Sequence, residues 1–337
     1  MFNNTRQGYV LRNNLKLAGF FLEKYKWGRD LRYEKASLSF EDQLDKLIDR
    51  GLVVNNRSLA LHYLAHLNYY RLGAYWLPFE ESRSPHKFAN GTTFEIVLNH
   101  YIFDREFRLH LLDGIERIEV SFRTQWAYHI SQKYGPHGYI VENSSLVYKN
   151  GRHRQSLEEL KEAVKRSDDL FIAHHRNTYN EEFPPAWVAC EIMSLGLLSR
   201  FYSNLRAYQV RRNISATYDF DESFFEGFLE HITYVRNVCA HHSRLWNRHL
   251  SKKMPLPRNK PQGLRENIYD DPSIQTEHKI YNTLVLIAYL IELVSPNSNW
   301  SGKLIKLLER YNIDVASMGF PSDWQEKPIW CQIISES

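Results

Sequence analysis

Arg236, Asn237 and His241 stand in one short stretch, RNVCAH, inside a segment whose apolar spacing predicts a helix from about 222 to about 248. On a helix that turns ~100° per residue, the three side chains fall on one arc. The opposite arc is mostly apolar and is expected to face the core. The polar arc, which has no Asp or Glu, also holds Ala240, Arg244, Asn247 and Arg248.

The residue types on this arc suit the cleavage of RNA without a metal ion. Solvated helix faces usually mix acids and bases, so an acid-free arc indicates an anionic partner, and the guanidinium fork of arginine matches phosphate. His241 lies beside the arginines and exchanges a proton near neutral pH. We expect His241 to act as acid or base on a ribose 2′-OH, Arg236 to stabilise the phosphate charge, and Asn237 to orient a neighbour or donate to phosphate.

The basic residues of the chain are concentrated in two segments. The whole chain carries 43 Lys and Arg against 39 Asp and Glu, a net charge of +4. Residues 231–265 hold eight cations and no acid, and residues 1–35 hold eight cations and three acids, which leaves −9 for the rest. A basic stretch in an acidic body predicts a polyanion-binding face, with a plain solvated surface as the alternative. The side chains expected to contact the RNA backbone are Arg244, Arg248, Lys252 and Lys253.

Helical periodicity dominates the chain, and strand signals are weak throughout. Ser39 with Asp42 and Thr92 with Glu95 are two predicted capping boxes, and Gly51 is a predicted helix stop. The pattern predicts an all-α protein built as a helical bundle. The expected helices are 39–50, 56–67, two between 92 and 134 that break near Gly114, 154–177, 186–206, 222–248, 275–294 and 300–311, before an irregular tail.

Several blocks between residues 36 and 250 resemble the AbiD/AbiF abortive-infection family of bacterial anti-phage proteins. They include, in order, LSFEDQLDKLIDRGL, LNYYRLGAYWLPF, PPAWVACEIMSLGLLSRFYSNL and YVRNVCAHHSRLWNR. Within the last block, RNVCAH matches the Arg-polar-x-x-x-His motif of HEPN-domain ribonucleases. Several agreeing blocks in one order are more specific than the short motif alone.

The resemblance implies a helical HEPN fold, usually dimeric, in which two Arg/His motifs meet at the interface to form one composite site. It implies a metal-independent endoribonuclease that acts as a toxin-like defence and leaves 2′,3′-cyclic phosphate ends. Some relatives are bound and restrained by a small structured RNA. Arg236, Asn237 and His241 match the motif, and Glu191 matches a characteristic family position as a supporting residue. The parts implied are a basic N-terminal extension (1–35), a HEPN-like helical core of abortive-infection type (36–250), and a C-terminal loop and helices (251–337).

Two groups of acids have a structural interpretation beside a functional one. Glu191 lies in an otherwise apolar helix, so we expect it to be buried against an arginine of the motif helix. There it either orients Arg236 or simply joins two helices. Glu116, Glu119 and Arg123 share one helical face, which predicts an internal salt-bridge set rather than a site.

No metal, cofactor or membrane contact is expected. His241 and His242 point ~100° apart on a helix, and no acidic ligand stands near them. We expect His242 to lie on the apolar face and to be satisfied by a hydrogen bond. The P-loop, Rossmann and HExxH motifs are missing, as are an apolar leader and a long apolar run, and the cysteines number three. These features predict a cytoplasmic protein in a reducing compartment.

Two other functions are compatible with the same residues. The first is an RNA-binding protein that binds, or is restrained by, a small structured RNA without cleaving it. The second is a helical dimer that serves protein interaction. Cleavage of RNA in EDTA distinguishes the enzyme from the RNA-binding protein, whose binding is expected to weaken steeply with salt. Absence of RNA that co-purifies with the protein favours the protein-interaction dimer.

Overall fold

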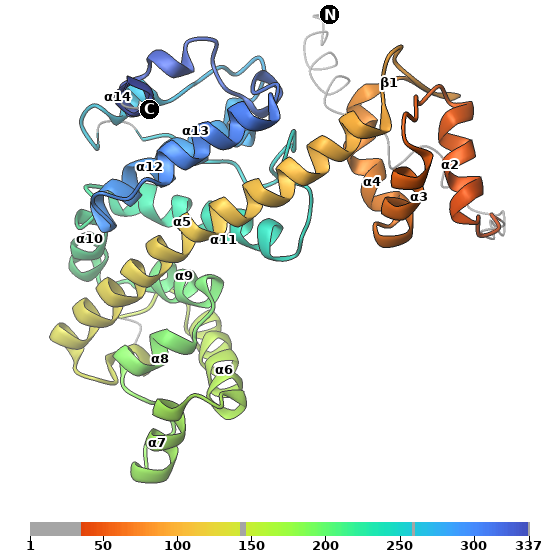
Figure 1. The fold of residues 1–337 in the computed structure, drawn as a ribbon. Helices are drawn as coiled ribbons and strands as arrows, with labels where there is room; N and C mark the ends of the chain where they lie inside the picture. The colour runs from red at the N-terminus through yellow and green to blue at the C-terminus, as the bar shows by residue number, and fades with distance from the viewer. Residues whose placement is uncertain (1–34, 142–145, 258–259, 336–337) are drawn as a thin grey trace, which may run out of the picture.

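The computed structural model describes residues 35–141, 146–257 and 260–335 and shows a mostly α-helical protein (Figure 1). The predicted all-α class is therefore confirmed, apart from one short β-hairpin. Of the expected basic extension, residues 1–34 lie outside the described residues. The elements are α2 (Phe40–Asp49), α3 (Arg57–His66), α4 (Tyr69–Trp76), β1 (Glu80–Arg83), β2 (His86–Phe88), α5 (Phe94–Tyr134), α6 (Asn150–Arg166), α7 (Leu170–Thr178), α8 (Ala186–Ile192), α9 (Leu195–Asn204), α10 (Tyr208–Ala216), α11 (Glu222–Ala240), α12 (Tyr281–Val294), α13 (Trp300–Tyr311) and α14 (Pro328–Ser335).

One long helix, α5, organises the molecule. Figure 1 shows α2–α4 at its N-terminal end, α6–α8 at its C-terminal end, and α12 and α13 along its middle. The helix has 41 residues, so the expected break near Gly114 is wrong. A Cβ atom at Gly114 would lie 2.8 Å from the Trp300 indole nitrogen and 2.9 Å from Ile287. Glycine therefore stands there because α12 and α13 approach closely, and not because the helix stops.

Local capping signals predicted some helix ends and missed others. Ser39 caps α2 by accepting the Asp42 N–H, as the capping box predicts, and Gly51 follows the helix with φ +94°. At α5 the cap is Thr93, one residue after the predicted Thr92. The predicted helices 154–177 and 186–206 are each two helices, α6 with α7 and α8 with α9. Helices α4, α10 and α14 and the hairpin were not predicted.

Helix α11 ends at Ala240 and not near 248, so the predicted helix is wrong in its last two turns. The Ser243 N–H donates to the Val238 carbonyl at 3.0 Å, and the His242 N–H donates to the Cys239 carbonyl at 3.0 Å. His242 has φ +56°, which completes the Schellman motif that ends many helices. Glycine usually holds that position, so a histidine there hides the stop from sequence analysis.

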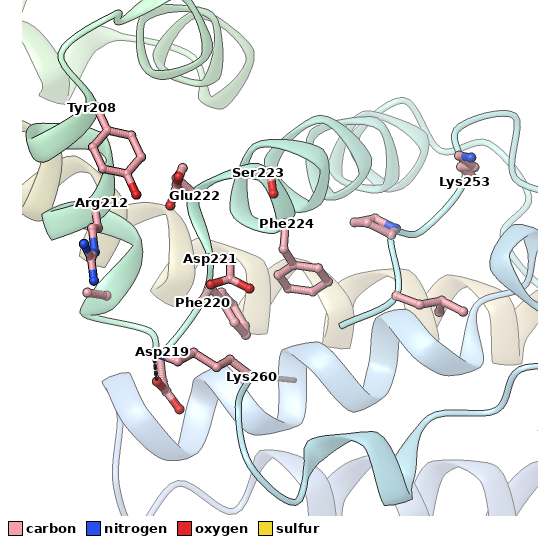
Figure 2. A pocket seen from close by; sticks show the side chains of 13 residues that line it. Tyr208, Arg212, Asp219, Phe220, Asp221, Glu222, Ser223, Phe224, Lys253 and Lys260 are labelled. Carbon is pink, nitrogen blue, oxygen red and sulfur yellow. Dashed lines mark ion pairs between the residues drawn. The ribbon is translucent and has the colours of Figure 1, made fainter. Parts of the chain in front are cut away.

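Beyond this turn the chain runs back along α11 toward the start of that helix. His231, in the middle of α11, is hydrogen-bonded through Nδ1 to the Lys252 carbonyl at 2.8 Å, and the Lys252 ammonium pairs with Glu230. Lys253 then lines a hollow of about 710 Å³ beside the N-terminal turn of α11 (Figure 2). The basic stretch is therefore spread along the whole helix instead of forming one arc at its end. The other labelled residues of the hollow are Tyr208, Arg212, Asp219, Phe220, Asp221, Glu222, Ser223, Phe224 and Lys260.

Candidate functional site

The three motif residues lie together on the outward side of the C-terminal end of α11. Asn237 and His241 are exposed and Arg236 is half-buried. Their neighbours Val238 and Cys239 are buried in the core. This part of the helix is amphipathic in the predicted sense, and His241 itself is the last, capping residue. Its imidazole is open to a ligand that approaches the end of the helix.

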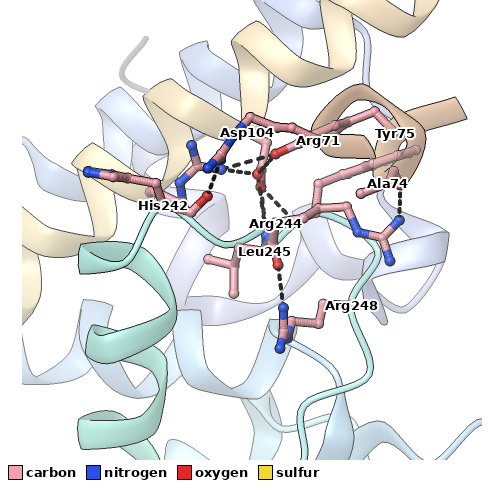
Figure 3. Close-up of polar contacts among 10 residues, drawn as sticks. Arg71, Ala74, Tyr75, Asp104, His242, Arg244, Leu245 and Arg248 are labelled. Carbon is pink, nitrogen blue, oxygen red and sulfur yellow. Dashed lines mark hydrogen bonds and ion pairs between the residues drawn. The ribbon is translucent and has the colours of Figure 1, made fainter. Parts of the chain in front are cut away.

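The turn after His241 is held by two residues from distant parts of the chain (Figure 3). Arg71, on α4, donates from Nη1 to the His242 carbonyl at 2.7 Å. Asp104, on α5, accepts the backbone N–H groups of Leu245 at 3.0 Å and Trp246 at 2.6 Å through Oδ1. The sharp turn and the loop beyond it are thus fixed to both α4 and α5.

Asp104 is fully buried but well satisfied. Besides the two backbone groups, it accepts the Tyr75 hydroxyl at 2.6 Å and forms an ion pair with Arg108, which is also buried. Burial raises the pKa of the Asp104 carboxyl, while Arg108, Tyr75 and the backbone N–H groups act in the opposite direction. Because its oxygens accept these donors together, Asp104 joins α4, α5 and the loop after α11 in one polar network.

Several arginines gather near this end of α11 without acidic partners. Arg244 donates to the Ala74 carbonyl on α4, and Arg248 donates to the Arg244 carbonyl at 3.0 Å (Figure 3). Within the part of the chain that the structure describes, Arg71, Arg236, Arg244 and Arg248 form no ion pair. Burial lowers the pKa of Arg244 and the nearby Arg248 adds to this effect, while Asp104 and Tyr75 oppose it. Asp104 already pairs with Arg108, so the cations of this region outnumber its acids, which favours an anionic ligand.

The predicted helical arc does not exist beyond Ala240, so Arg244 and Arg248 are carried by the loop after α11. Arg248 also contacts through Nε, at 3.3 Å, the hydroxyl of Tyr234, which precedes the motif on α11. Lys252 and Lys253 are drawn away toward the other end of the helix. Of the four side chains predicted to contact the RNA backbone, Arg244 and Arg248 thus belong to the loop that follows the motif, whereas the two lysines lie farther back along α11.

Glu191 does not meet the motif helix as expected. Its side chain is 48% exposed, and its carboxylate lies 3.7 Å from the Arg123 guanidinium of α5. Arg123 also pairs with Glu119 at 2.6 Å and donates to the Met193 carbonyl at 2.9 Å. The predicted Glu119–Arg123 salt bridge is confirmed, whereas the expected burial of Glu191 against a motif arginine is wrong, because Arg123 is the arginine that α8 meets.

His242 also departs from its prediction. Its side chain is exposed and its backbone takes the left-handed conformation just after the end of α11, so it does not lie on an apolar helix face. Its carbonyl, rather than its imidazole, makes the contact that fixes the turn.

Arg71 and Asp104 are the residues that sequence analysis missed. Both act on a loop more than 100 residues away in the chain, so no local spacing reveals them. The available signal for Asp104 was its place in a helical pattern between apolar residues at 102–103 and Phe107. A carboxylate buried in a helix needs hydrogen-bond or ionic partners, so such an Asp indicates a tertiary contact. In the aromatic stretch around Arg71, Tyr75 and Trp76 are buried in the core.

Comparison with known proteins identifies a family for the segment that contains these residues. The model of a family described as "Abi-like protein" matches residues 62–247, more than half of the chain. The matched segment includes Arg71, Asp104, Glu191 and the motif residues. Neither the curated proteins nor the solved structures contain a match. Among the described residues, the helices are too short or too polar for any of them to cross a membrane.

Proposed function

This chain belongs to the family of Abi-like proteins, and from that premise we propose that it is a metal-independent endoribonuclease of a bacterial anti-phage abortive-infection or toxin–antitoxin system. The family supports a role in abortive infection. The finer proposal, a HEPN-type nuclease of AbiD/AbiF kind, rests on one observation. His241 is exposed at the end of α11, Arg236 lies five residues before it, and Arg71, which forms no ion pair among the described residues, donates to the carbonyl of the next residue.

The proposed reaction is an internal displacement at phosphorus. His241 takes the proton from a ribose 2′-OH, and the oxygen attacks the adjacent phosphate. The bond to the 5′ oxygen breaks, that oxygen takes up a proton, and a 2′,3′-cyclic phosphate remains. Arg236 stabilises the charge on the phosphate oxygens in the transition state, and Asn237 donates to the phosphate or orients the substrate. Arg244 and Arg248 hold the neighbouring backbone.

A second copy of the chain completes the proposed site. The attacking and leaving oxygens lie on opposite sides of the phosphorus, so one imidazole does not serve both as base and as acid in the same step. A homodimer with the two α11 ends facing each other supplies two His241 side chains and two Arg236 side chains. The exposure of Asn237 and His241 on the single chain leaves this end of α11 accessible to a partner copy.

The test is RNA cleavage by purified protein in EDTA. His241→Ala is expected to reduce cleavage by about 10²- to 10⁴-fold, the usual range for loss of an acid–base group. Its affinity for RNA is expected to stay within about threefold, since phosphate contacts by the arginines remain. The matched control is His249→Ala, which removes an exposed histidine from the same basic stretch and is expected to cleave like the wild type.

Two results would contradict the proposal. Retained cleavage by His241→Ala would refute the assigned mechanism. RNA binding by the wild type with no cleavage would refute the nuclease and favour an RNA-binding protein that binds, or is restrained by, a small structured RNA. Sequencing of RNA bound or cut in cells by the wild type and by His241→Ala identifies the RNA in either case.

A further inference from the structure

A second cationic site lies between α5 and α13, on another side of α5 from Asp104. A hollow of about 370 Å³ is lined there by Glu106, His110, Lys303, Lys306, Leu307 and Arg310. On a helix that turns ~100° per residue, Glu106 and His110 point ~200° and ~240° away from Asp104. The hollow therefore opens away from the network that fixes the end of α11. Its volume falls in the range of small-ligand sites.

The cations of this hollow form a row on α13. Lys303, Lys306 and Arg310 stand at spacings of three and four residues, so they share one face over roughly 10 Å. All three are exposed. Arg310 pairs with Glu106 at 3.3 Å, and the Tyr311 hydroxyl donates to the same carboxylate at 2.8 Å. Over the residues that the structure describes, Lys303 and Lys306 form no ion pair, so the lining has a net positive charge.

His110 adds an unsatisfied nitrogen to this wall. Its ring stacks on Trp300, with ring centroids 4.5 Å apart, and its Nε2 is buried without a hydrogen-bond partner among the described residues. Burial lowers the pKa of His110 to about 4; Asp113 and a hydrogen bond with the Trp300 backbone oppose this shift, and Lys303 adds to it. At neutral pH the imidazole is therefore uncharged and has one N–H to donate. A buried polar atom without a partner is uncommon in a folded protein, and a bound anion beside it would supply one.

We propose that this hollow binds a phosphate group, held by Lys303, Lys306 and Arg310 and in contact with His110. The anion supplies the negative counter-charge that the two lysines lack, and its oxygens supply a hydrogen-bond acceptor for the imidazole. The row of cations lies outside the segment matched by the family, and the site does not depend on the proposed cleavage. Two sources present the same chemistry, the backbone of an RNA and a free phosphate.

The experiment measures binding of inorganic phosphate by calorimetry and of a labelled twelve-nucleotide RNA by fluorescence anisotropy. Both use full-length protein that carries His241→Ala, which prevents cleavage from obscuring binding. The test variant is Lys303→Ala with Lys306→Ala. The matched control is Lys133→Ala with Lys149→Ala, which removes the same charge from two exposed lysines near the other end of α5.

The lysine pair on α13 is expected to lose at least tenfold in affinity for one of the two ligands relative to the control pair. For RNA, the slope of log affinity against log salt is expected to fall by about 1.4, since each phosphate contact to a single strand contributes ~0.7. A third variant, His110→Phe, keeps the stack on Trp300 but removes the nitrogens, and is expected to lose roughly three- to tenfold.

Each outcome decides the proposal. Weakened binding of inorganic phosphate assigns the hollow to a free anion, and weakened binding of RNA alone assigns it to the RNA backbone. Equal affinities in the α13 pair and the control pair, for both ligands, overturn the proposal, as does a parent His241→Ala protein that binds neither ligand. Because cleavage is scored separately at His241, a failure of the nuclease proposal leaves this result interpretable.

Discussion

Asp104 is the residue on which the geometry of the α11 end depends most. Its Oδ1 accepts the N–H groups of Leu245 and Trp246, and its Oδ2 accepts the Tyr75 hydroxyl and pairs with Arg108. We predict that Asp104→Asn, which is nearly isosteric, strongly destabilises the protein and releases this loop. The amide removes the negative charge and presents an NH2 group to donors that need an acceptor.

The size of the effect follows from the burial of the partner. The Arg108 side chain is 5% exposed, so the variant leaves a guanidinium in the core without a counter-charge. Breaking a buried pair from one side costs about 3–5 kcal/mol. Since natural domains are stable by only about 5–15 kcal/mol, the midpoint of urea unfolding is expected to fall by about a fifth or more.

The assay is urea unfolding at pH 7 of the wild type, Asp104→Asn, Arg108→Met and the double variant. The double variant is expected to be less destabilised than the sum of the single variants by at least about 2 kcal/mol, because it removes both buried charges. Leu111→Ala is the control, since it makes a core cavity on the same helix at a cost of about 2–5 kcal/mol without touching the network.

Hydrogen exchange separates loss of the loop anchor from general instability. Under native conditions the amides of Leu245 and Trp246 are expected to exchange faster in Asp104→Asn than in Leu111→Ala at matched stability. A loss below about 1 kcal/mol for Asp104→Asn, or additive effects of the two network variants, would show that this carboxylate does not hold the loop.

Three further predictions test other parts of the structure. Gly114→Ala is expected to lower the free energy of unfolding by about 1–3 kcal/mol, because its Cβ would meet side chains of α12 and α13, whereas Gly151→Ala, with open space around it, is expected to be neutral or stabilising. Burial lowers the pKa values of His231 and His110 to about 4, so the unfolded chain binds more protons between pH 6.5 and 4. The free energy of unfolding is therefore expected to fall as the pH drops through that range, by at most about 3 kcal/mol per histidine. His110→Phe is expected to remove the contribution of His110 to this pH dependence. An unchanged pH dependence of the urea midpoint in that variant would contradict the assignment. Arg71→Gln is expected to slow RNA cleavage about tenfold at saturating RNA while barely moving the urea midpoint, because it loosens the turn after α11 but is itself exposed; cleavage at the wild-type rate would show that the turn needs no such support.

The parts of the fold that the sequence predicts are those with local causes. Helix α2 begins at a serine that caps its own first turn and is followed by a glycine with positive φ, so its limits can be inferred from neighbouring residues. Helix α13 occupies 300–311, as its apolar spacing predicts. The end of α11 fails the same test, because His242 takes the left-handed conformation without being glycine and is held there by Arg71, from another helix.

The candidate site shows the same division between local and distant causes. Arg236, Asn237 and His241 are within two turns of one helix, and their common outward face follows from helical geometry. The positions of Arg244 and Arg248 have a different cause, because the loop that carries them is fixed to Asp104 and Ala74. No periodicity in the sequence predicts these long-range contacts. The helical projection of Arg244 and Arg248 was wrong because α11 ends at Ala240.

The path of the chain after α11 also changes what the excess of positive charge means. The acid-free stretch runs back along the helix, so Lys252 pairs with Glu230 and Lys253 lines the same hollow as Asp221 and Glu222 at the start of α11. These lysines are therefore poor candidates for RNA contacts at the motif, and their replacement is expected to change RNA affinity less than replacement of Arg244 or Arg248. In their place the fold brings Arg71 to the motif from α4. The proposed anion-binding site at this end of α11 would thus be built from arginines of two separate segments, which lie far apart in the sequence and which the Asp104 network joins.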